Sequence, residues 1–236
     1  MLASVGCAAL LAGCGGQGAG KQPGVVDPAD HDAFFLWAGV SAPEVLDHAR
    51  RVYLLAGEVR HDDPDRFVSL RATPRISHAE LWLVVRVERI DWGEAVYGEV
   101  LRRLALWQEA GNRLIGLQID FDAVTRGLAG YAEFLGGLRK RLPETLALSV
   151  TGLLDWSAGG DPGALAGLAG ILDEVVIQTY QGRHTIPGYE AYLASLMRLP
   201  IPYRIALVEG GDWHEPAGLA SDPEFRGFVV FLLGNS

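Results

Sequence analysis

From residue 30 onward the chain alternates regularly between two kinds of segment, and this alternation limits its possible folds more than any other feature. Apolar runs of strand length alternate with segments whose apolar residues recur at the period of a helix. The runs lack a polar face, which is typical of strands that are buried on both sides. The predicted strands are Phe34–Ala38, Val52–Gly57, Leu81–Val87, Leu114–Phe121, Ala147–Thr151, Val175–Tyr180, Tyr203–Val208 and Phe228–Leu233. The predicted helices are Ala42–Arg51, Trp92–Ala110, Arg126–Leu142, Pro162–Leu172 and Pro187–Arg198.

Eight strands in β-α alternation predict a single α/β domain of the (β/α)8 TIM-barrel type. An open doubly wound sheet is the main alternative, but no glycine-rich loop with nucleotide-binding spacing joins an early strand to a helix. We expect a trimmed barrel, because Gly57–Ser77 is irregular and Gly210–Gly227 leaves room for roughly one helical turn before the last strand. Gly111 is placed to end the Trp92–Ala110 helix as its C′ residue.

Both cysteines lie in the first fourteen residues, Cys14 directly after an apolar run of small residues. The stretch Leu11-Ala12-Gly13-Cys14 resembles the lipobox of bacterial lipoproteins, although no Lys or Arg precedes the apolar run. The resemblance implies cleavage before Cys14 and a lipid anchor on it. The expected organisation is a signal peptide over 1–13, a flexible tether over 14–29 and a barrel over 30–236. The protein is then exported and anchored to the cell envelope, with the lipid as its only membrane element.

The charge of the chain argues against some partners. The net charge is −9 and the sequence contains no long basic run, so a nucleic acid would be repelled. No cluster of His, Asp and Glu has metal-ligand spacing, since His61-Asp62-Asp63 is typical of a solvated loop. We expect neither a metal nor a cofactor.

The run from Leu114 to Asp122 carries the most information about function. Side chains alternate along a strand, so Gln118, Asp120 and Asp122 share one face. In a barrel that face lines the interior and rises to the C-terminal rim, where barrel enzymes place their sites. Two carboxylates roughly 6.5–7 Å apart at Cα suit one general acid beside one ionised partner. Alternatively Asp120 only pairs with Arg86, which points inward from the preceding strand, and Asp122 caps the next helix.

The run Gly116-Leu-Gln-Ile-Asp-Phe-Asp122 resembles the strand-four signature of chitinase-like glycoside hydrolases. The resemblance places Asp120 as the assisting aspartate and Asp122 where the family has its catalytic glutamate. Gln118 stands in place of the first inward aspartate, and Asp122 is one methylene shorter than the family's acid. Gln178-Thr179-Tyr180-Gln181 resembles the strand-six signature, which implies that Tyr180 steadies the reacting sugar with Gln178 beside it.

Essentially all of residues 30–235 also resembles a bacterial family of predicted lipoproteins, the domain of unknown function 3142. The segments that carry this likeness are LQIDFDA, SVTGLLDW and VVIQTYQGRHT. This resemblance implies the barrel fold and export, and it implies no activity.

Further candidates follow other predicted strands. An acid next to an aromatic residue suits a sugar site, because indole rings pack on pyranose faces and carboxylates bind hydroxyls. The candidates are Asp155 and Trp156 after the fifth strand, Glu209 and Trp213 after the seventh, and Trp37 at the end of the first. Each has a purely structural alternative, in which it packs under a loop or caps a turn. His184 is more typical of a surface loop.

The residues together predict an envelope-anchored, carbohydrate-active barrel that acts as a glycoside hydrolase on a polysaccharide. Two alternatives stay open: a glycan-binding protein without catalysis, and a structural envelope lipoprotein whose inward acids only form ion pairs.

Overall fold

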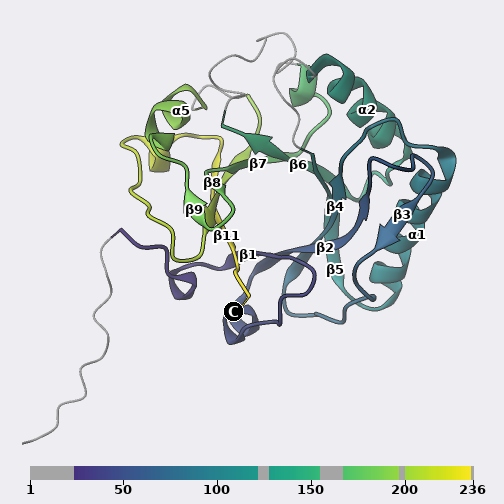
Figure 1. The fold of residues 1–236 in the computed structure, drawn as a ribbon, viewed down its shortest axis with the longest axis horizontal. Helices are drawn as coiled ribbons and strands as arrows, with labels where there is room; N and C mark the ends of the chain where they lie inside the picture. The colour runs from purple at the N-terminus through teal and green to yellow at the C-terminus, as the bar shows by residue number, and fades with distance from the viewer. Residues whose placement is uncertain (1–23, 122–127, 155–166, 197–199, 235–236) are drawn as a thin grey trace, which may run out of the picture.

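The computed structural model describes residues 24–121, 128–154, 167–196 and 200–234. Eight parallel strands close into a barrel (Figure 1), which confirms the predicted fold class and all eight predicted strands. Each strand pairs with its neighbours, and β1 closes the ring by pairing with both β11 and β2. The strands are β1 (Ala33–Leu36), β2 (Arg51–Val59), β4 (Glu80–Val87), β5 (Arg113–Asp120), β6 (Ala147–Leu153), β7 (Glu174–Gln178), β10 (Tyr203–Val208) and β11 (Phe225–Phe231).

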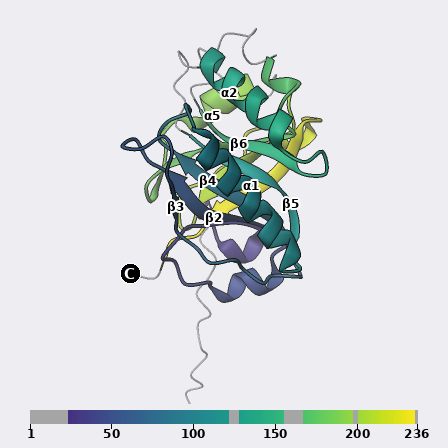
Figure 2. The ribbon, with the colours of Figure 1, turned by 90° about the vertical axis from the view of Figure 1, so that its right-hand side faces the viewer.

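Helices cover the outside of the ring (Figures 1 and 2). They include α1 (Glu94–Glu109), α2 (Leu128–Arg141) and α5 (Tyr189–Leu196), each within a predicted helix. Only the 3-10 turn η4 (Leu219–Ser221) lies in the connection from β10 to β11, as the short Gly210–Gly227 segment predicts. Part of the predicted Pro162–Leu172 helix lies outside the described residues.

The predicted helix over Ala42–Arg51 is wrong. The structure has a 3-10 helix, η2 (Glu44–His48), which follows Pro43 and ends at Ala49. The backbone is extended at Pro43 and again at Ala49, which limits the helical stretch to the five residues between them.

Side-chain alternation separates the apolar residues into an outer and an inner cluster. On β4, Leu81, Leu83 and Val85 join the outer cluster that the helices cover, whereas Trp82 and Val84 belong to the inner one. The inner cluster is small and aromatic, and it includes Phe35 and Tyr53. Near the C-terminal ends of the strands, several inward positions carry polar side chains instead. This end of the barrel is where a ligand site is expected.

Two segments add to the barrel. The short strand β3 (Phe67–Ser69) pairs antiparallel with the end of β2, so part of the irregular Gly57–Ser77 stretch extends the sheet. Val26 is buried and exchanges backbone hydrogen bonds with Gly210 and Gly211, and the 3-10 turn η1 (Pro28–Asp30) follows it. The chain therefore joins the domain before residue 29, the predicted end of the tether.

Cys14 and the predicted signal peptide lie outside the described residues. No helix in the described part of the chain is long and apolar enough to cross a membrane.

Candidate functional site

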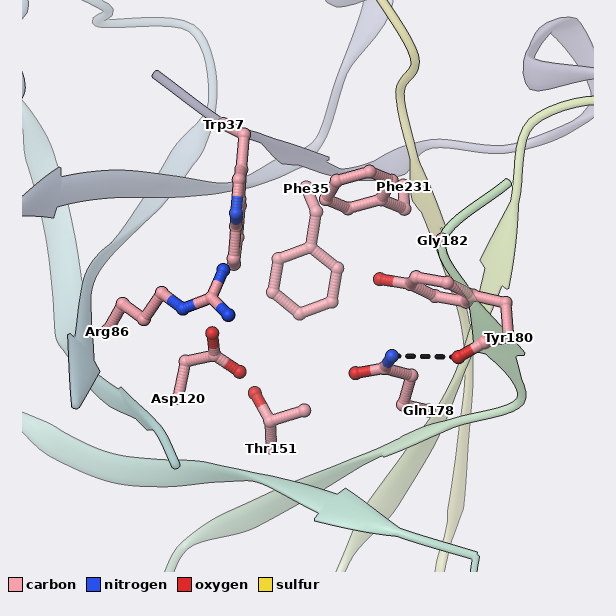
Figure 3. Close-up of a pocket in the computed structure, with 9 residues that line it drawn as sticks. All are labelled: Phe35, Trp37, Arg86, Asp120, Thr151, Gln178, Tyr180, Gly182 and Phe231. Carbon is pink, nitrogen blue, oxygen red and sulfur yellow. Dashed lines mark hydrogen bonds between the residues drawn. The ribbon is translucent and has the colours of Figure 1, made fainter. Parts of the chain in front are cut away.

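A pocket of about 300 Å³ opens at the C-terminal end of the barrel strands (Figure 3). Six barrel strands or the residues just after them contribute to it, together with the hairpin of β8 (Tyr180–Gln181) and β9 (His184–Thr185). Its lining consists of Phe35, Trp37, Arg86, Asp120, Thr151, Gln178, Tyr180, Gly182 and Phe231. Five predicted site residues are thus brought together: Trp37, Arg86, Asp120, Gln178 and Tyr180.

Asp120 and Arg86 lie opposite each other in the register of β5 and β4. Figure 3 shows the guanidinium of Arg86 and the carboxylate of Asp120 facing one another on one side of the pocket. Both residues also line a second hollow of about 260 Å³ together with Val87, Glu88 and Phe121. The pair therefore stands between two adjoining hollows, and a ligand longer than one of them would pass over it.

Tyr180 presents its phenol group to the pocket (Figure 3) and is only 8% exposed. Its backbone carbonyl accepts a 2.8 Å hydrogen bond from Gln178 Nε2, which orients the amide beside it. Burial raises the pKa of the Tyr180 phenol well above 10, and the charge of Asp120 raises it further. The phenol therefore stays protonated at neutral pH and can donate a hydrogen bond to a ligand.

Thr151 contributes a pocket-lining hydroxyl that the sequence analysis did not select. Its Oγ1 is buried and has no hydrogen-bond partner among the described residues, so it is available to a ligand or a water molecule. One layer deeper, Gln118 Nε2 donates to Ser149 Oγ at 3.2 Å, and Gln118 Oε1 has no partner in the part of the chain that the structure describes. The inward phase of Ala147 and Ser149 would have identified Thr151, because it is the next inward position toward the rim.

An aromatic wall faces these polar groups. Phe231 lies at its centre, with ring centroids 5.3 Å from both Trp37 and Tyr180, and Phe35 packs edge-on against Trp37 at 5.8 Å. Arg71 holds this wall from behind, because its guanidinium donates to the backbone carbonyls of Trp37 and Leu55. The two phenylalanines were missed as site residues because an apolar inward residue looks the same in sequence as core.

The predictions for Glu209 and Trp213 are not supported by their positions. Glu209 accepts a 2.7 Å hydrogen bond from the backbone nitrogen of Leu233, so its carboxylate ties β10 to the end of β11. Trp213 stacks on Tyr189 at 4.8 Å and packs against the outer cluster, away from the pocket lining. Glu209 and Trp213 therefore make structural contacts and are not among the residues that line the pocket.

Three further predicted residues, Asp122, Asp155 and Trp156, lie outside the described residues. His184 is exposed on the β8–β9 hairpin and is not among the lining residues of the pocket. Across the described ranges, no group of three His, Cys, Asp or Glu side chains is placed to hold a metal ion.

Residues 81–203 match the model of the family described as Domain of unknown function (DUF3142). The chain belongs to this family. The match covers more than half of the chain and includes all three segments that carried the resemblance, although it is shorter than the predicted extent of 30–235. No match was found among curated proteins.

Solved structures with the same fold include enzymes and an inhibitor. A GH18 chitinase from Pseudoalteromonas aurantia is 14% identical, with a TM-score of 0.52 over 85% of this chain and 94% of that one. A xylanase and alpha-amylase inhibitor protein from Scadoxus multiflorus is 8% identical, with a TM-score of 0.54 over 85% and 92%. The Bacillus cereus spore cortex-lytic enzyme SleL is 17% identical, with a TM-score of 0.51 over 75% and 49%. At such identities the likeness establishes a chitinase-like barrel and no activity.

Proposed function

We propose that the pocket binds a saccharide and that the protein acts as a glycoside hydrolase on a polysaccharide at the cell envelope. The observation that carries this proposal is the convergence of Asp120, Arg86, Gln178, Tyr180 and Thr151 opposite an aromatic wall. The apolar face of a pyranose packs on aromatic rings, while its hydroxyls require fixed donors and acceptors. A pocket of about 300 Å³ with both kinds of wall offers the two at once.

In this mechanism the Tyr180 phenol and the Gln178 amide hold the sugar next to Asp120. Asp120 accepts a hydrogen bond from the reacting unit and orients it. Asp122, two residues further along the chain and outside the described residues, donates its proton to the glycosidic oxygen as the bond to the anomeric carbon breaks. Water then supplies the hydroxyl of the new reducing end, and its remaining proton restores the acid.

A glycan-binding function without hydrolysis is the second candidate. It is favoured by the aspartate at position 122, whose side chain is one methylene shorter than the glutamate of the family that the strand resembles. A catalytic acid that falls short by roughly 1.5 Å loses much of its rate advantage. The same pocket would then capture a glycan and release it unchanged.

Turnover of a panel of soluble polysaccharides by the purified protein separates the two candidates. For a hydrolase, Asp122→Asn should lower kcat about 10²–10⁴-fold with little change in glycan binding. Glu209→Gln is the matched control, because this carboxylate bonds the backbone outside the pocket and its amide can still accept that bond. Equal activity of the parent protein and Asp122→Asn would remove Asp122 as the acid.

Binding without turnover, weakened by Tyr180→Phe and unchanged by Asp122→Asn, would select the glycan-binding function. Failure of every glycan to bind would leave the structural alternative, in which Asp120 and Arg86 serve only each other.

The envelope location is part of the same proposal and is tested on its own. In cells that express the full chain, Cys14→Ser should abolish incorporation of a radiolabelled fatty acid and move the protein out of the membrane fraction. Unchanged fractionation and labelling would contradict a lipid anchor at Cys14.

A further inference from the structure

A third cavity, of about 220 Å³, lies at the opposite end of the barrel from the proposed saccharide pocket. Strands begin at this end, and four arginines line it. Arg50 directly precedes β2, Arg51 is its first residue, and Arg204 and Arg226 are the second residues of β10 and β11. Asp32 and Glu80 are the two acids in the lining. Four positive and two negative side chains therefore line this basal pocket in a protein whose net charge is −9.

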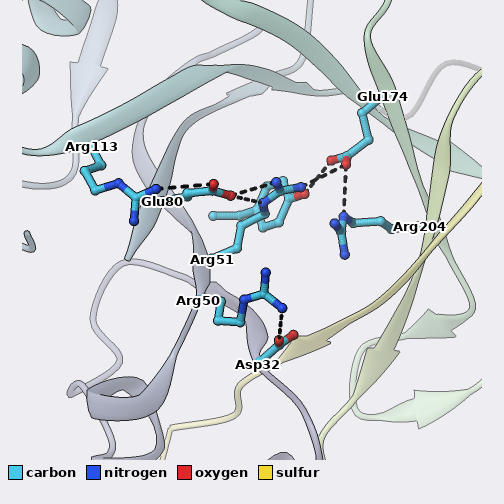
Figure 4. A network of polar contacts seen from close by, with 8 residues as sticks. Asp32, Arg50, Arg51, Glu80, Arg113, Glu174 and Arg204 are labelled. Atoms are coloured by element: carbon cyan, nitrogen blue, oxygen red, sulfur yellow. Dashed lines mark hydrogen bonds and ion pairs between the residues drawn. The ribbon is translucent and has the colours of Figure 1, made fainter. Parts of the chain in front are cut away.

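Glu174 connects two of these arginines, Arg51 and Arg204, and is not itself in the lining of the basal pocket. It is 6% exposed, and its carboxylate accepts from Arg51 Nη1 at 3.2 Å, from Arg204 Nε at 2.9 Å and from the Tyr53 hydroxyl (Figure 4). Glu80 occupies the rest of the Arg51 guanidinium, with bonds of 3.0 and 2.7 Å from Nε and Nη2. Each of the three guanidinium nitrogens of Arg51 thus has an acceptor within the protein.

Arg204 differs from Arg51 in this respect. Its Nε is bound to Glu174, but neither terminal nitrogen has an acceptor in the described part of the chain, although the side chain is only 15% exposed. Nη1 faces the wall at Gly227, where a β-carbon added to the glycine would lie 3.5 Å from it. A guanidinium with its free edge turned into a cavity is suited to a bound anion, since charge-assisted hydrogen bonds are the strong ones.

Arg50 provides a second available cation at the mouth of the basal pocket. Its only ion pair in the described residues is a 3.5 Å contact with Asp32, and its side chain is 85% exposed. Arg50 directly precedes β2 and Arg204 belongs to β10, so their donors enter the basal pocket from different parts of the ring and are suited to different oxygens of one group. Such an arrangement suits a tetrahedral oxyanion better than a single planar carboxylate.

We propose that the basal pocket binds a phosphate or sulfate group, either as the free ion or as the end of a larger molecule. This site is separate from the saccharide pocket and does not depend on the function proposed for it. Its position at the base of the barrel, where strands from distant parts of the sequence meet, means that the anion would also stabilise the closed ring.

Calorimetric titration and thermal unfolding of the full protein test the proposal, with inorganic phosphate as the probe and sodium chloride at equal ionic strength as the reference. Phosphate should bind with saturation and raise Tm above the chloride reference. Arg204→Gln should weaken phosphate binding about 10-fold or more, in keeping with the loss of a charge-assisted contact. Arg50→Gln, on an exposed side chain that folding does not need, should weaken it about 3-fold.

Arg102→Gln is the control, because Arg102 is an exposed arginine that pairs with Glu99 on α1. It should leave phosphate affinity unchanged. Glycerol 3-phosphate, with glycerol as its neutral reference, separates the two sources: binding of both phosphates indicates a site open to a larger molecule, and binding of inorganic phosphate alone indicates the free ion.

Absence of saturable phosphate binding would overturn the proposal. So would phosphate binding that Arg50→Gln and Arg204→Gln leave unchanged. If Arg204→Gln does not fold, the comparison of Arg50→Gln with Arg102→Gln decides.

Discussion

Gly116 lies on β5 at a position that faces the barrel interior, next to the indole of Trp82. A β-carbon at this residue would lie 2.3 Å from Trp82 Cζ3 and 2.5 Å from the backbone oxygen of Ala147. Neither the backbone of Ala147 nor the buried ring of Trp82 can move aside easily to make room for a β-carbon. This glycine of β5 is therefore required by packing inside the ring, beneath the residues that line the pocket at the C-terminal rim.

Gly116→Ala should destabilise the protein by about 1–3 kcal/mol, the usual cost of overpacking a filled core. Gly137→Ala is the matched change, since this glycine lies in the middle of α2 and a β-carbon there meets nothing within 4 Å. It should stabilise by roughly 0.5–1 kcal/mol through helix propensity. Urea unfolding of both variants measures the two effects, and a neutral Gly116→Ala would show that the interior yields.

Gly111 and Asn112 lie in the turn between α1 and β5, and they stabilise it in different ways. Gly111 has φ of +85° and donates its N–H to Gln108 O, which ends α1 in the predicted way. Asn112 is 8% exposed and joins three separate backbone groups: it accepts from Ile76 N and donates to the carbonyls of Pro74 and Trp107. This corner fixes the end of the helix and the start of the strand that carries Asp120.

Asn112→Ala should lower the free energy of unfolding by about 3 kcal/mol, because three hydrogen bonds of about 1 kcal/mol each are lost in a buried place. Gly111→Ala should cost only about 1–2 kcal/mol, the strain of a left-handed residue with a β-carbon. Thermal and urea unfolding check this order. A larger loss for Gly111→Ala than for Asn112→Ala would contradict the assignment of Asn112 as the main tie.

Across the molecule as a whole, charged residues that are far apart in sequence close the base of the barrel. Arg51 bonds Glu80 and Glu174, and so joins β2 to β4 and to β7 across the ring (Figure 4). Burial alone would raise the pKa of Glu80, but its hydrogen bonds from Arg51 and the charges of Arg51, Arg113 and Arg50 outweigh burial, and the net pKa is lowered. A carboxyl whose pKa is lower folded than unfolded stabilises the fold at neutral pH.

The stabilisation by Glu80 should be complete above the ordinary carboxyl pKa, and it should be lost as the pH falls through the lowered pKa of the folded state. Glu80→Gln should therefore reduce the free energy of unfolding at pH 7, and the difference from the parent protein should shrink as the pH falls below about 4. Unfolding curves between pH 7 and pH 3 measure it. Glu133→Gln, at an exposed carboxyl on α2, is the control; an equal effect of both substitutions would contradict the role of Glu80.

The amino-acid pattern was enough to define the strands, the ring that they form and the inward face of each strand. Hydrophobic period is a local property, so it placed Gln118, Asp120 and Arg86 on the interior before any contact was known. The position of the candidate pocket at the C-terminal rim followed from the barrel itself.

Which rim residues meet depends on contacts between distant segments. Glu209 and Trp213 have the composition of a sugar site, yet Glu209 binds a backbone amide and Trp213 stacks on Tyr189. Phe231 joins the pocket lining although an inward apolar residue looks the same in sequence as core. The four arginines of the basal pocket come from positions 50 to 226, and no local pattern relates them. Their proximity results from the closure of the ring through β1, and closure depends on every strand at once.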